Sequence, residues 1–267
     1  MDLEIKNRVA IVTGASTGIG YAVARELVEN GVSVTITARG QDRLDMAAAS
    51  LKKIGGNVLS IAMDASKPDA ASEIVRQTID RFKQLDILVN NAGRAHAGGL
   101  LSSSESDWTE MTEIKLGAMR RLCKEAVPHM QKAKWGRIVN MSSIGGIYPN
   151  PKLLISHVLS SAINNLTKSL ALEVAGDGIL VNAIGIGAVA TDNWSSNMTP
   201  AVRKSHPEWS ALSDEEVLAR ISAERTPVGR AGDPREIAAL AVFLASNRNG
   251  FVTGDTIEAS GGADRFM

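Results

Sequence analysis

The sequence predicts a single α/β domain built on a doubly wound parallel sheet, and three observations support this prediction. Short apolar runs alternate with amphipathic stretches along the whole chain. The runs are β-branched and apolar on both faces, which is typical of strands that helices cover on each side. The 267 residues suffice for one large domain with a substantial core, and no internal repeat, linker or low-complexity tract divides them.

Seven segments are expected to form strands, and helical patterns lie between them. The ranges are Arg8–Thr13, Val32–Ala38, Val58–Met63, Leu85–Val89, Ile138–Met141, Ile179–Ala183 and Gly254–Ala259. The first helical patterns are Ile19–Asn30 and Pro68–Phe82, with Pro68 near a helix start, where proline is common. Strand–helix alternation of this kind implies parallel strands that are joined by right-handed crossovers.

Two features distinguish the second half of the chain. An expected strand ends at Ser143, and a long helical pattern follows at Ser156–Val174. Further on, Thr191–Arg225 is a long polar insertion that contains tryptophan. We expect it to be a helical lid on the substrate side, although a mobile surface loop would have the same composition. Residues 1–267 are therefore interpreted as one domain, with this insertion as its lid.

Composition excludes several classes of protein. Lys plus Arg and Asp plus Glu both number 29, so no long-range field favours nucleic acid or an anionic membrane. Aromatic residues make up only 4% of the chain, too few for the base-stacking surface of a single-strand binder. The single cysteine, Cys123, excludes an internal disulfide and a cysteine-based metal cluster, and no histidine pair has metal-ligand spacing. No apolar run approaches the roughly 18 residues of a membrane span, and the N-terminus lacks an apolar signal core. We therefore expect a soluble cytoplasmic protein that binds no nucleic acid, membrane or metal.

A glycine-rich turn follows the first expected strand and opens the first helix. It reads TGASTGIG over Thr13–Gly20. Glycines let the backbone turn sharply and approach a diphosphate, whose charge the free amides of a helix N-terminus stabilise. The residues expected to bind a dinucleotide here are Gly14, Ser16, Thr17, Gly18, Ile19 and Gly20.

The end of the second expected strand distinguishes NADP from NAD. An acidic residue there would bond the adenosine ribose hydroxyls and indicate NAD. The chain instead has Thr37–Ala38–Arg39, and the guanidinium of Arg39 suits a 2′-phosphate. This favours NADP(H) over NAD(H), the alternative being that Arg39 is a solvated surface charge.

Several ordered motifs together resemble the short-chain dehydrogenase/reductase family. They are TGASTGIG, Asp64 after the third strand, NNAG at Asn90–Gly93, GRIVNMSS, VNAIGIGAVAT, RTPVGRAGDPREIAALAVFLAS and TGDTIEASGG. The resemblance covers essentially the whole chain and implies a Rossmann-type fold. Members of the family commonly pair the helices that correspond to Glu105–Met130 and Leu153–Ala175. The resemblance therefore also implies a homodimer or a homotetramer.

The resemblance assigns further cofactor contacts. Asp64 and Ala65 should contact the adenine, and Thr191 should touch the nicotinamide carboxamide. The NNAG residues Asn91, Ala92 and Gly93 should line the ribose side. One departure is that the family's usual Pro-Gly reads Ile186–Gly187 here, which puts the usual nicotinamide pose in question.

The resemblance also implies that the catalytic residues have changed. The family uses a serine, a tyrosine, a lysine and an asparagine, and the serine position matches Ser143. The usual interval of 13 residues leads from Ser143 to Ser156 in the tyrosine position, and Thr167–Leu170 fixes the register. The lysine position is then Ser160, and the asparagine position is Lys115.

Two side chains are candidates to compensate for these changes. Lys115 is expected either to enter the space of the missing lysine or to remain a solvated lysine near the helix surface. Tyr148–Lys152 spells Tyr-x-x-x-Lys, but its two prolines forbid the helical turn that would align the pair. Only Tyr148 itself could then enter the site, from a loop, the alternative being a tyrosine packed on the surface.

Three functions remain open at this point. The leading hypothesis is an enzyme that binds NADP(H) and acts on a small or medium hydroxy or carbonyl compound, with Ser143 as hydrogen-bond donor and Lys115 as the relocated cation. Its redox character follows from the family resemblance. The alternatives are a non-redox lyase, hydrolase, dehydratase or isomerase on the same scaffold, and a nucleotide-sensing protein without turnover.

Overall fold

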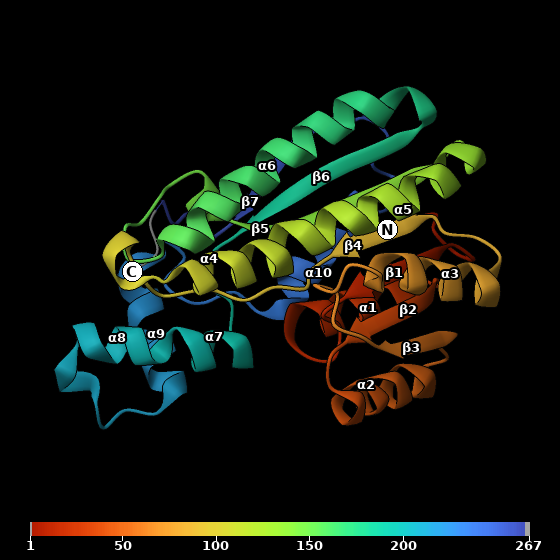
Figure 1. Ribbon diagram of the computed structural model, residues 1–267. Coiled ribbons are helices and arrows are strands. Elements are labelled where there is room, and N and C mark those ends of the chain that lie inside the picture. The colour runs from red at the N-terminus through yellow and green to blue at the C-terminus, as the bar shows by residue number, and fades with distance from the viewer. Residues whose placement is uncertain (1, 265–267) are drawn as a thin grey trace.

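A seven-stranded parallel sheet forms the centre of the computed structural model, which describes residues 2–264 (Figure 1). The strand order is β3-β2-β1-β4-β5-β6-β7. The strands are β1 (Val9–Thr13), β2 (Ser33–Ala38), β3 (Val58–Ala62), β4 (Ile87–Asn90), β5 (Gly136–Ser143), β6 (Ile179–Ile186) and β7 (Thr256–Ala259). The predicted doubly wound α/β fold is confirmed, and the order reverses between β1 and β4, where such sheets bind ligands.

Helices cover both faces of this sheet. One face packs on α1 (Gly18–Glu29), α2 (Gln41–Lys53) and α10 (Pro234–Leu244). The other packs on α3 (Ala70–Phe82), α5 (Ala118–Ala133) and α6 (Leu154–Val174). Successive residues of a strand serve opposite cores, as Ala10 and Val12 lie in the first and Ile11 in the second. This two-sided burial explains why the strands are continuous apolar runs.

A smaller group of helices lies at one end of the molecule (Figure 1). It contains α7 (Asp192–Asn197), α8 (Thr199–Ser205) and α9 (Asp214–Arg225). Its side chains form a separate apolar cluster that includes Trp194 and Trp209 and also reaches Ile144 and Leu153 of the main body. The predicted insertion, Thr191–Arg225, is therefore helical and packs beside the carboxyl end of β5.

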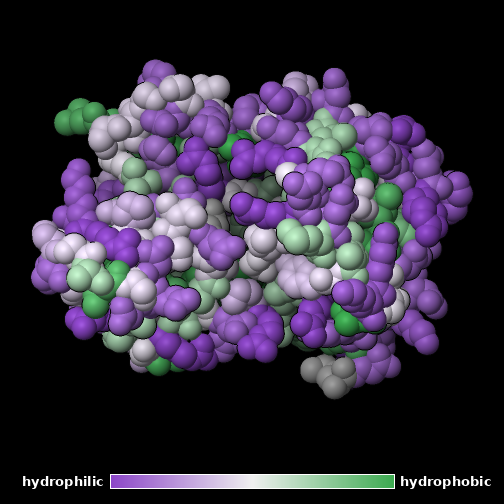
Figure 2. All heavy atoms as spheres, turned by 90° about the horizontal axis from the view of Figure 1, so that it is seen from below, coloured by the Kyte–Doolittle hydropathy of each residue, from purple (hydrophilic) through white to green (hydrophobic). Residues whose placement is uncertain are grey.

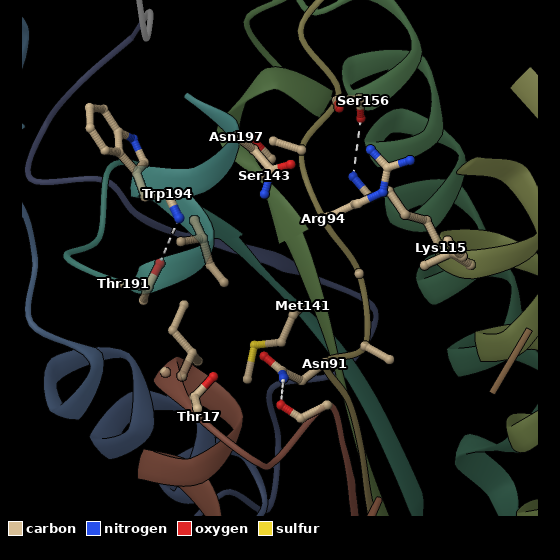
Figure 3. Close-up of a pocket in the computed structure, with 18 of the residues that line it drawn as sticks. Thr17, Asn91, Arg94, Lys115, Met141, Ser143, Ser156, Thr191, Trp194 and Asn197 are labelled. Carbon is tan, nitrogen blue, oxygen red and sulfur yellow. Dashed lines mark hydrogen bonds between the residues drawn. The ribbon is translucent and has the colours of Figure 1, made fainter. Parts of the chain in front are cut away.

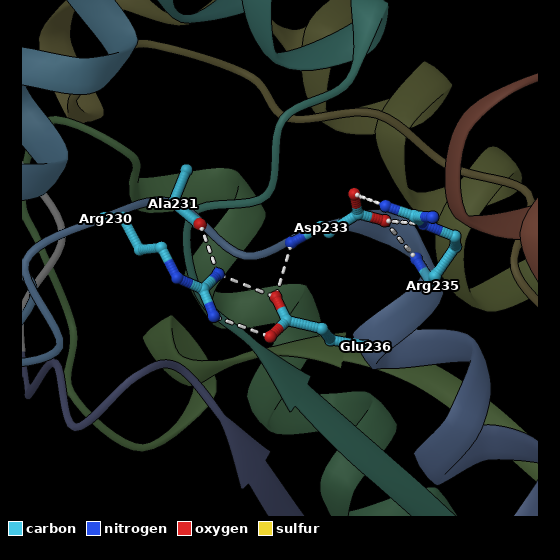
Figure 4. A network of polar contacts seen from close by, with 5 residues as sticks. All are labelled: Arg230, Ala231, Asp233, Arg235 and Glu236. Carbon is cyan, nitrogen blue, oxygen red and sulfur yellow. Dashed lines mark hydrogen bonds and ion pairs between the residues drawn. The ribbon is translucent and has the colours of Figure 1, made fainter.

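Helix α10 begins with a dense polar network (Figure 4). Asp233 is the N-cap residue and forms a capping box with Glu236. The two Nη atoms of Arg230 donate to the two carboxylate oxygens of Glu236, at 2.7 and 2.8 Å. Nη2 of Arg235 forms an ion pair with Oδ2 of Asp233 at 2.9 Å. Such caps satisfy the free amides of the first helical turn.

Helix α4 (Glu105–Thr112) continues into α5 through one turn of π-helix, Glu113–Gly117. Turns of this kind occur mostly inside longer helices and frequently at functional sites. Lys115 lies at the middle of this turn. None of the helices in residues 2–264 combines the length and the apolar character needed to cross a bilayer.

The buried strand β1 offers a direct test of the core. Ile11 is 0% exposed, whereas Ile54, after α2, is 43% exposed. Ile11→Ala should lower the free energy of unfolding by about 2–5 kcal/mol, because it leaves a cavity in the centre of the sheet. Ile54→Ala should change it by less than about 0.5 kcal/mol. Denaturant titration measures both, and equal effects would contradict the assigned core.

Candidate active site

A cavity of about 830 Å³ opens at the carboxyl ends of the strands. Its lining includes Gly14 after β1, Arg39 after β2, Asp64 after β3 and Asn91 after β4. The face seen in Figure 2 is hollowed near its centre, and hydrophilic residues gather around the hollow. The cavity thus coincides with the reversal of strand order, where the fold predicts a ligand.

The glycine-rich turn presents open backbone amides to this cavity. Gly14 and Gly18 have φ of +64° and +59°, in the left-handed region that favours glycine. Helix α1 begins at Gly18, and its N-cap residue Thr17 makes no side-chain cap bond. The N-terminal amides of α1 are therefore available to an anion, as a diphosphate requires.

Asn91 ties the end of β4 to the same turn. Its amide nitrogen Nδ2 donates to the carbonyl oxygens of Thr13 and Gly14, at 2.9 and 3.1 Å (Figure 3). Gly20 serves the packing of this turn, because a Cβ atom there would collide with Asn91 and Gly14. Within the described chain, Gly20 is not one of the cavity-lining residues, so the structure shows it packing behind the turn and not at the expected cofactor surface.

The adenosine end of the cavity contains two arginines. Arg39 lines it as predicted, and Arg43, in the first turn of α2, lines it too. Sequence analysis missed Arg43, because Arg39 lies before the helix and no helical spacing joins the two. Asp64 and Ala65 line the neighbouring wall. Burial raises the pKa of Asp64, but the Ser66 hydroxyl and amide donate to its carboxylate and lower the pKa overall.

Most of the remaining predicted cofactor residues also lie at the cavity. Ser16, Thr17, Ile19, Ala92, Gly93 and Thr191 all line it. Thr191 is the N-cap residue of α7 and accepts a hydrogen bond from the Trp194 amide at 3.2 Å (Figure 3). Ile186 and Gly187, the departure from the family's Pro-Gly, line the same region.

At the opposite end, three of the predicted catalytic residues line the cavity: Ser143, Lys115 and Ser156. The Oγ atom of Ser143 accepts a hydrogen bond from the Gly145 amide at 3.1 Å. This bond leaves the proton of the Ser143 hydroxyl available to another acceptor. Ser143 can therefore donate to an oxygen atom in the cavity.

Lys115 points from the π-helical turn toward α6 (Figure 3). Its Nζ atom donates to the backbone oxygen of Ser156 at 3.3 Å and to Oγ of Ser160 at 3.2 Å. Across residues 2–264, no carboxylate lies within ion-pair distance of this ammonium group. Burial lowers the pKa of Lys115 to about 8. The group can therefore hold or release a proton near neutral pH.

The hydroxyl groups of the two serines of α6 make hydrogen bonds to backbone groups and to Lys115. Oγ of Ser156 accepts a hydrogen bond from the backbone amide of His96 at 2.7 Å, so it fixes the loop after β4. Ser160 is fully buried, and its hydroxyl donates to the Ser156 backbone oxygen at 2.8 Å. Among the described residues, Ser160 does not line the cavity as expected, and its hydroxyl instead contacts Lys115 behind the cavity wall.

Tyr148 also lies outside the cavity lining of residues 2–264, which matches the alternative of a tyrosine packed on the surface and not the one in which it enters the site. Its amide bonds the Ile144 oxygen at 2.8 Å within a tight turn, and Pro149 follows directly. The turn directs its hydroxyl to Glu258, 3.3 Å away, and its ring packs against the α7–α9 cluster. The nearby Glu258 charge raises the pKa of Tyr148.

His157 lines the cavity next to Ser156. Its Nδ1 atom accepts a hydrogen bond from the Asn150 amide at 2.8 Å. Burial, and then the charge of Lys115, lower the pKa of His157 to about 4. The imidazole is consequently neutral at physiological pH, with its proton on Nε2. Within the described part of the chain, no group of three His, Cys, Asp or Glu side chains could hold a metal ion.

The amino-acid sequence is similar to those of known oxidoreductases. The family described as enoyl-(acyl carrier protein) reductase matches residues 14–264. The 3-oxoacyl-[acyl-carrier-protein] reductase of Vibrio cholerae is 35% identical over 97% of this chain and 98% of its own. A dehydrogenase subunit of Thauera aromatica, BbsD, named for (2S)-[(R)-hydroxy(phenyl)methyl]succinyl-CoA, is 34% identical over 99% of both chains.

The fold is also similar to those of solved reductase structures. The L-sorbose reductase of Gluconobacter frateurii, complexed with NADPH and L-sorbose, superposes with a TM-score of 0.92 at 31% identity and 100% coverage of both chains. YwfH, an NADPH-dependent reductase involved in bacilysin biosynthesis, gives 0.85 at 28% identity, with 96% of this chain and 97% of its own covered. The chain therefore belongs to the short-chain dehydrogenase/reductase family.

Proposed function

We propose that the protein is an NADP(H)-dependent oxidoreductase of carbonyl or hydroxy compounds, in which Lys115 replaces the tyrosine and lysine of its family. The observation that carries this proposal is the Lys115 ammonium beside Ser160, in the space that a smaller side chain leaves. The NADPH-binding reductases among its structural relatives support the cofactor and the reaction class.

The residues of the cavity fit this cofactor. The open amides at Gly18 and the left-handed glycines suit a diphosphate, and Asp64 with Ala65 suits an adenine. Arg39 and Arg43 supply cations for a 2′-phosphate. When bound, the nicotinamide would donate or accept the hydride of the reaction.

The chain's own residues would bind the reacting oxygen and supply its proton. Ser143 would donate a hydrogen bond to that oxygen, since its hydroxyl proton is available. Lys115 would deliver the proton during reduction and remove it during oxidation, because a general acid or base works best with a pKa near the operating pH. Ser156 is a poor alternative, because its hydroxyl proton is directed at the backbone oxygen of His96, 3.4 Å away, and a serine donates protons weakly without a partner.

We further propose that residues 191–225 act as a lid over the substrate. Trp194, Met198 and Asn197 line the cavity from this segment, which would exclude water from the reacting atoms. We also infer from the family resemblance that copies pair through α5 and α6 into dimers or tetramers.

Removing the adenosine-end cations should change the choice of cofactor. The double change Arg39→Ala with Arg43→Ala should weaken NADPH binding at least about tenfold, because a charged hydrogen bond contributes about 1.5–3 kcal/mol. NADH binding should change little, since NADH has no 2′-phosphate. Fluorescence titration with both nucleotides measures this preference. Equal losses for NADPH and NADH would contradict the assignment of these arginines.

Removing the ammonium of Lys115 should abolish most of the activity. Lys115→Met should lower kcat about 10²–10⁴-fold, the usual contribution of a positioned acid. The exposed Lys124→Met on α5 is the matched control and should keep normal turnover. In the unchanged protein, reduction should slow as pH rises through about 8, where Lys115 loses its proton, and oxidation should accelerate.

Steady-state kinetics in both directions, with substrate panels, test this assignment. Near-normal turnover by Lys115→Met would remove Lys115 from the mechanism. Nucleotide binding without turnover of any carbonyl or hydroxy compound would instead indicate a sensing protein.

A further inference from the structure

We propose that the substrate carries an anionic group, a carboxylate or a phosphate, which Arg94 binds beside Lys115. This inference rests on the proposed function and names the substrate class for the same site. It depends on three observations: a cation without a counter-ion, a second cation with unused donors, and a loop that is fixed in place.

The first observation is the uncompensated charge of Lys115. Its two hydrogen-bond acceptors, the Ser156 backbone oxygen and the Ser160 hydroxyl, are both neutral. A partly buried ammonium group without an anionic partner is costly, because neutral dipoles replace only part of its hydration. An anion that entered the cavity would stabilise this charge.

The second observation is the position of Arg94, which sequence analysis missed although it directly follows the NNAG motif. Arg94 lines the cavity, and its guanidinium extends toward the region of Ser156 and Lys115 (Figure 3). Its single ion-pair contact in the described structure joins Nη2 to Oε2 of Glu110, 3.0 Å away. A guanidinium has five N–H donors arranged to bind a carboxylate or phosphate through two parallel bonds. Most donors of Arg94 thus remain available.

Of the two cations, Arg94 is ion-paired with Glu110, and in the described residues no other carboxylate forms an ion pair with either one. Asp192, at the start of α7, lines the cavity but its side chain is exposed, and Asp64 lies at the adenosine end. Glu110 sits on α4 with 52% of its side chain exposed, against 29% for Arg94. His157 is neutral because of its low pKa. The catalytic end is therefore electropositive and suits an anion.

The third observation is the anchoring of the loop that carries Arg94. Ser156 binds the His96 amide at 2.7 Å. Two backbone bonds, from the Gly98 amide to Lys152 at 2.7 Å and from the Leu154 amide to Gly98 at 3.0 Å, fix the far end of the loop. Binding sites recognise ligands best when their supporting elements are held in advance. Ser156 is thus a positioning residue for Arg94.

The opposite wall of the cavity is apolar. Ile144, Leu153, Trp194 and Met198 line it and belong to the apolar cluster of the α7–α9 segment. A carbon skeleton can pack there while its anionic group faces Arg94. The substrate class is an oxo or hydroxy compound with a carboxylate or phosphate at one end.

Calorimetric titration of the NADP⁺-loaded protein tests this inference. NADP⁺ occupies the nucleotide's own phosphate sites, so an added anion reports on the catalytic end. The probes are malonate, its neutral isostere malonamide, and inorganic phosphate, at constant ionic strength. We expect malonate or phosphate to bind at least about tenfold more tightly than malonamide. Whichever anion shows this preference identifies the carboxylate or the phosphate as the preferred group.

The variant Arg94→Gln should remove that preference. Arg230→Gln, which changes an arginine that is ion-paired outside the cavity, is the matched control and should keep it. Equal binding of anion and malonamide, no anion binding, or a preference that persists in Arg94→Gln would each overturn the inference. The proposed function fails separately, through absent NADP⁺ binding or absent turnover, and neither result depends on Arg94.

Discussion

The proposed catalytic site depends on one interaction: the ammonium group of Lys115 is held by neutral oxygens in a partly buried wall of the cavity. Two local features produce it. A single π-helical turn between α4 and α5 carries Lys115. The small side chains of Ser156 and Ser160 leave room for the ammonium, and its two acceptors are the Ser156 backbone oxygen and the Ser160 hydroxyl. With a bulky side chain at either serine, the same lysine could not reach this position without displacing its neighbours.

The two ends of the cavity are built on different principles. The nucleotide end is made chiefly of backbone: glycines with positive φ, open amides at α1, and a network from Asn91 to the turn. Backbone geometry of this kind tolerates little substitution, since a Cβ atom at Gly20 would collide with its neighbours. The catalytic end is made of side chains, and these can exchange roles while the fold stays the same. Under the proposed function, this chain keeps the cofactor site of its family and alters the proton transfer.

Sequence reasoning was strongest where a pattern depends on local geometry. All seven predicted strands are present, with ends within a few residues, because buried parallel strands are continuous apolar runs. It was weaker for side chains that tertiary packing positions. Of the two alternatives left open for Tyr148, the structure matches the surface one, because the turn at Ile144–Gly146 directs that ring outward. Arg94 was missed because its direction depends on the loop that Ser156 anchors. The π-helical turn at Lys115 has no sequence signature that could have revealed it.

The titration of Lys115 tests most directly whether its ammonium group is held among neutral acceptors. Carbon-13 NMR of isotopically labelled lysine side chains, with the Lys115 signal assigned by its loss in Lys115→Arg, follows the charge of the group as pH changes. A lysine that is buried among neutral acceptors should titrate at about 8. A midpoint at the ordinary lysine value of 10.5 would show a solvated or acid-paired ammonium and would contradict the central claim.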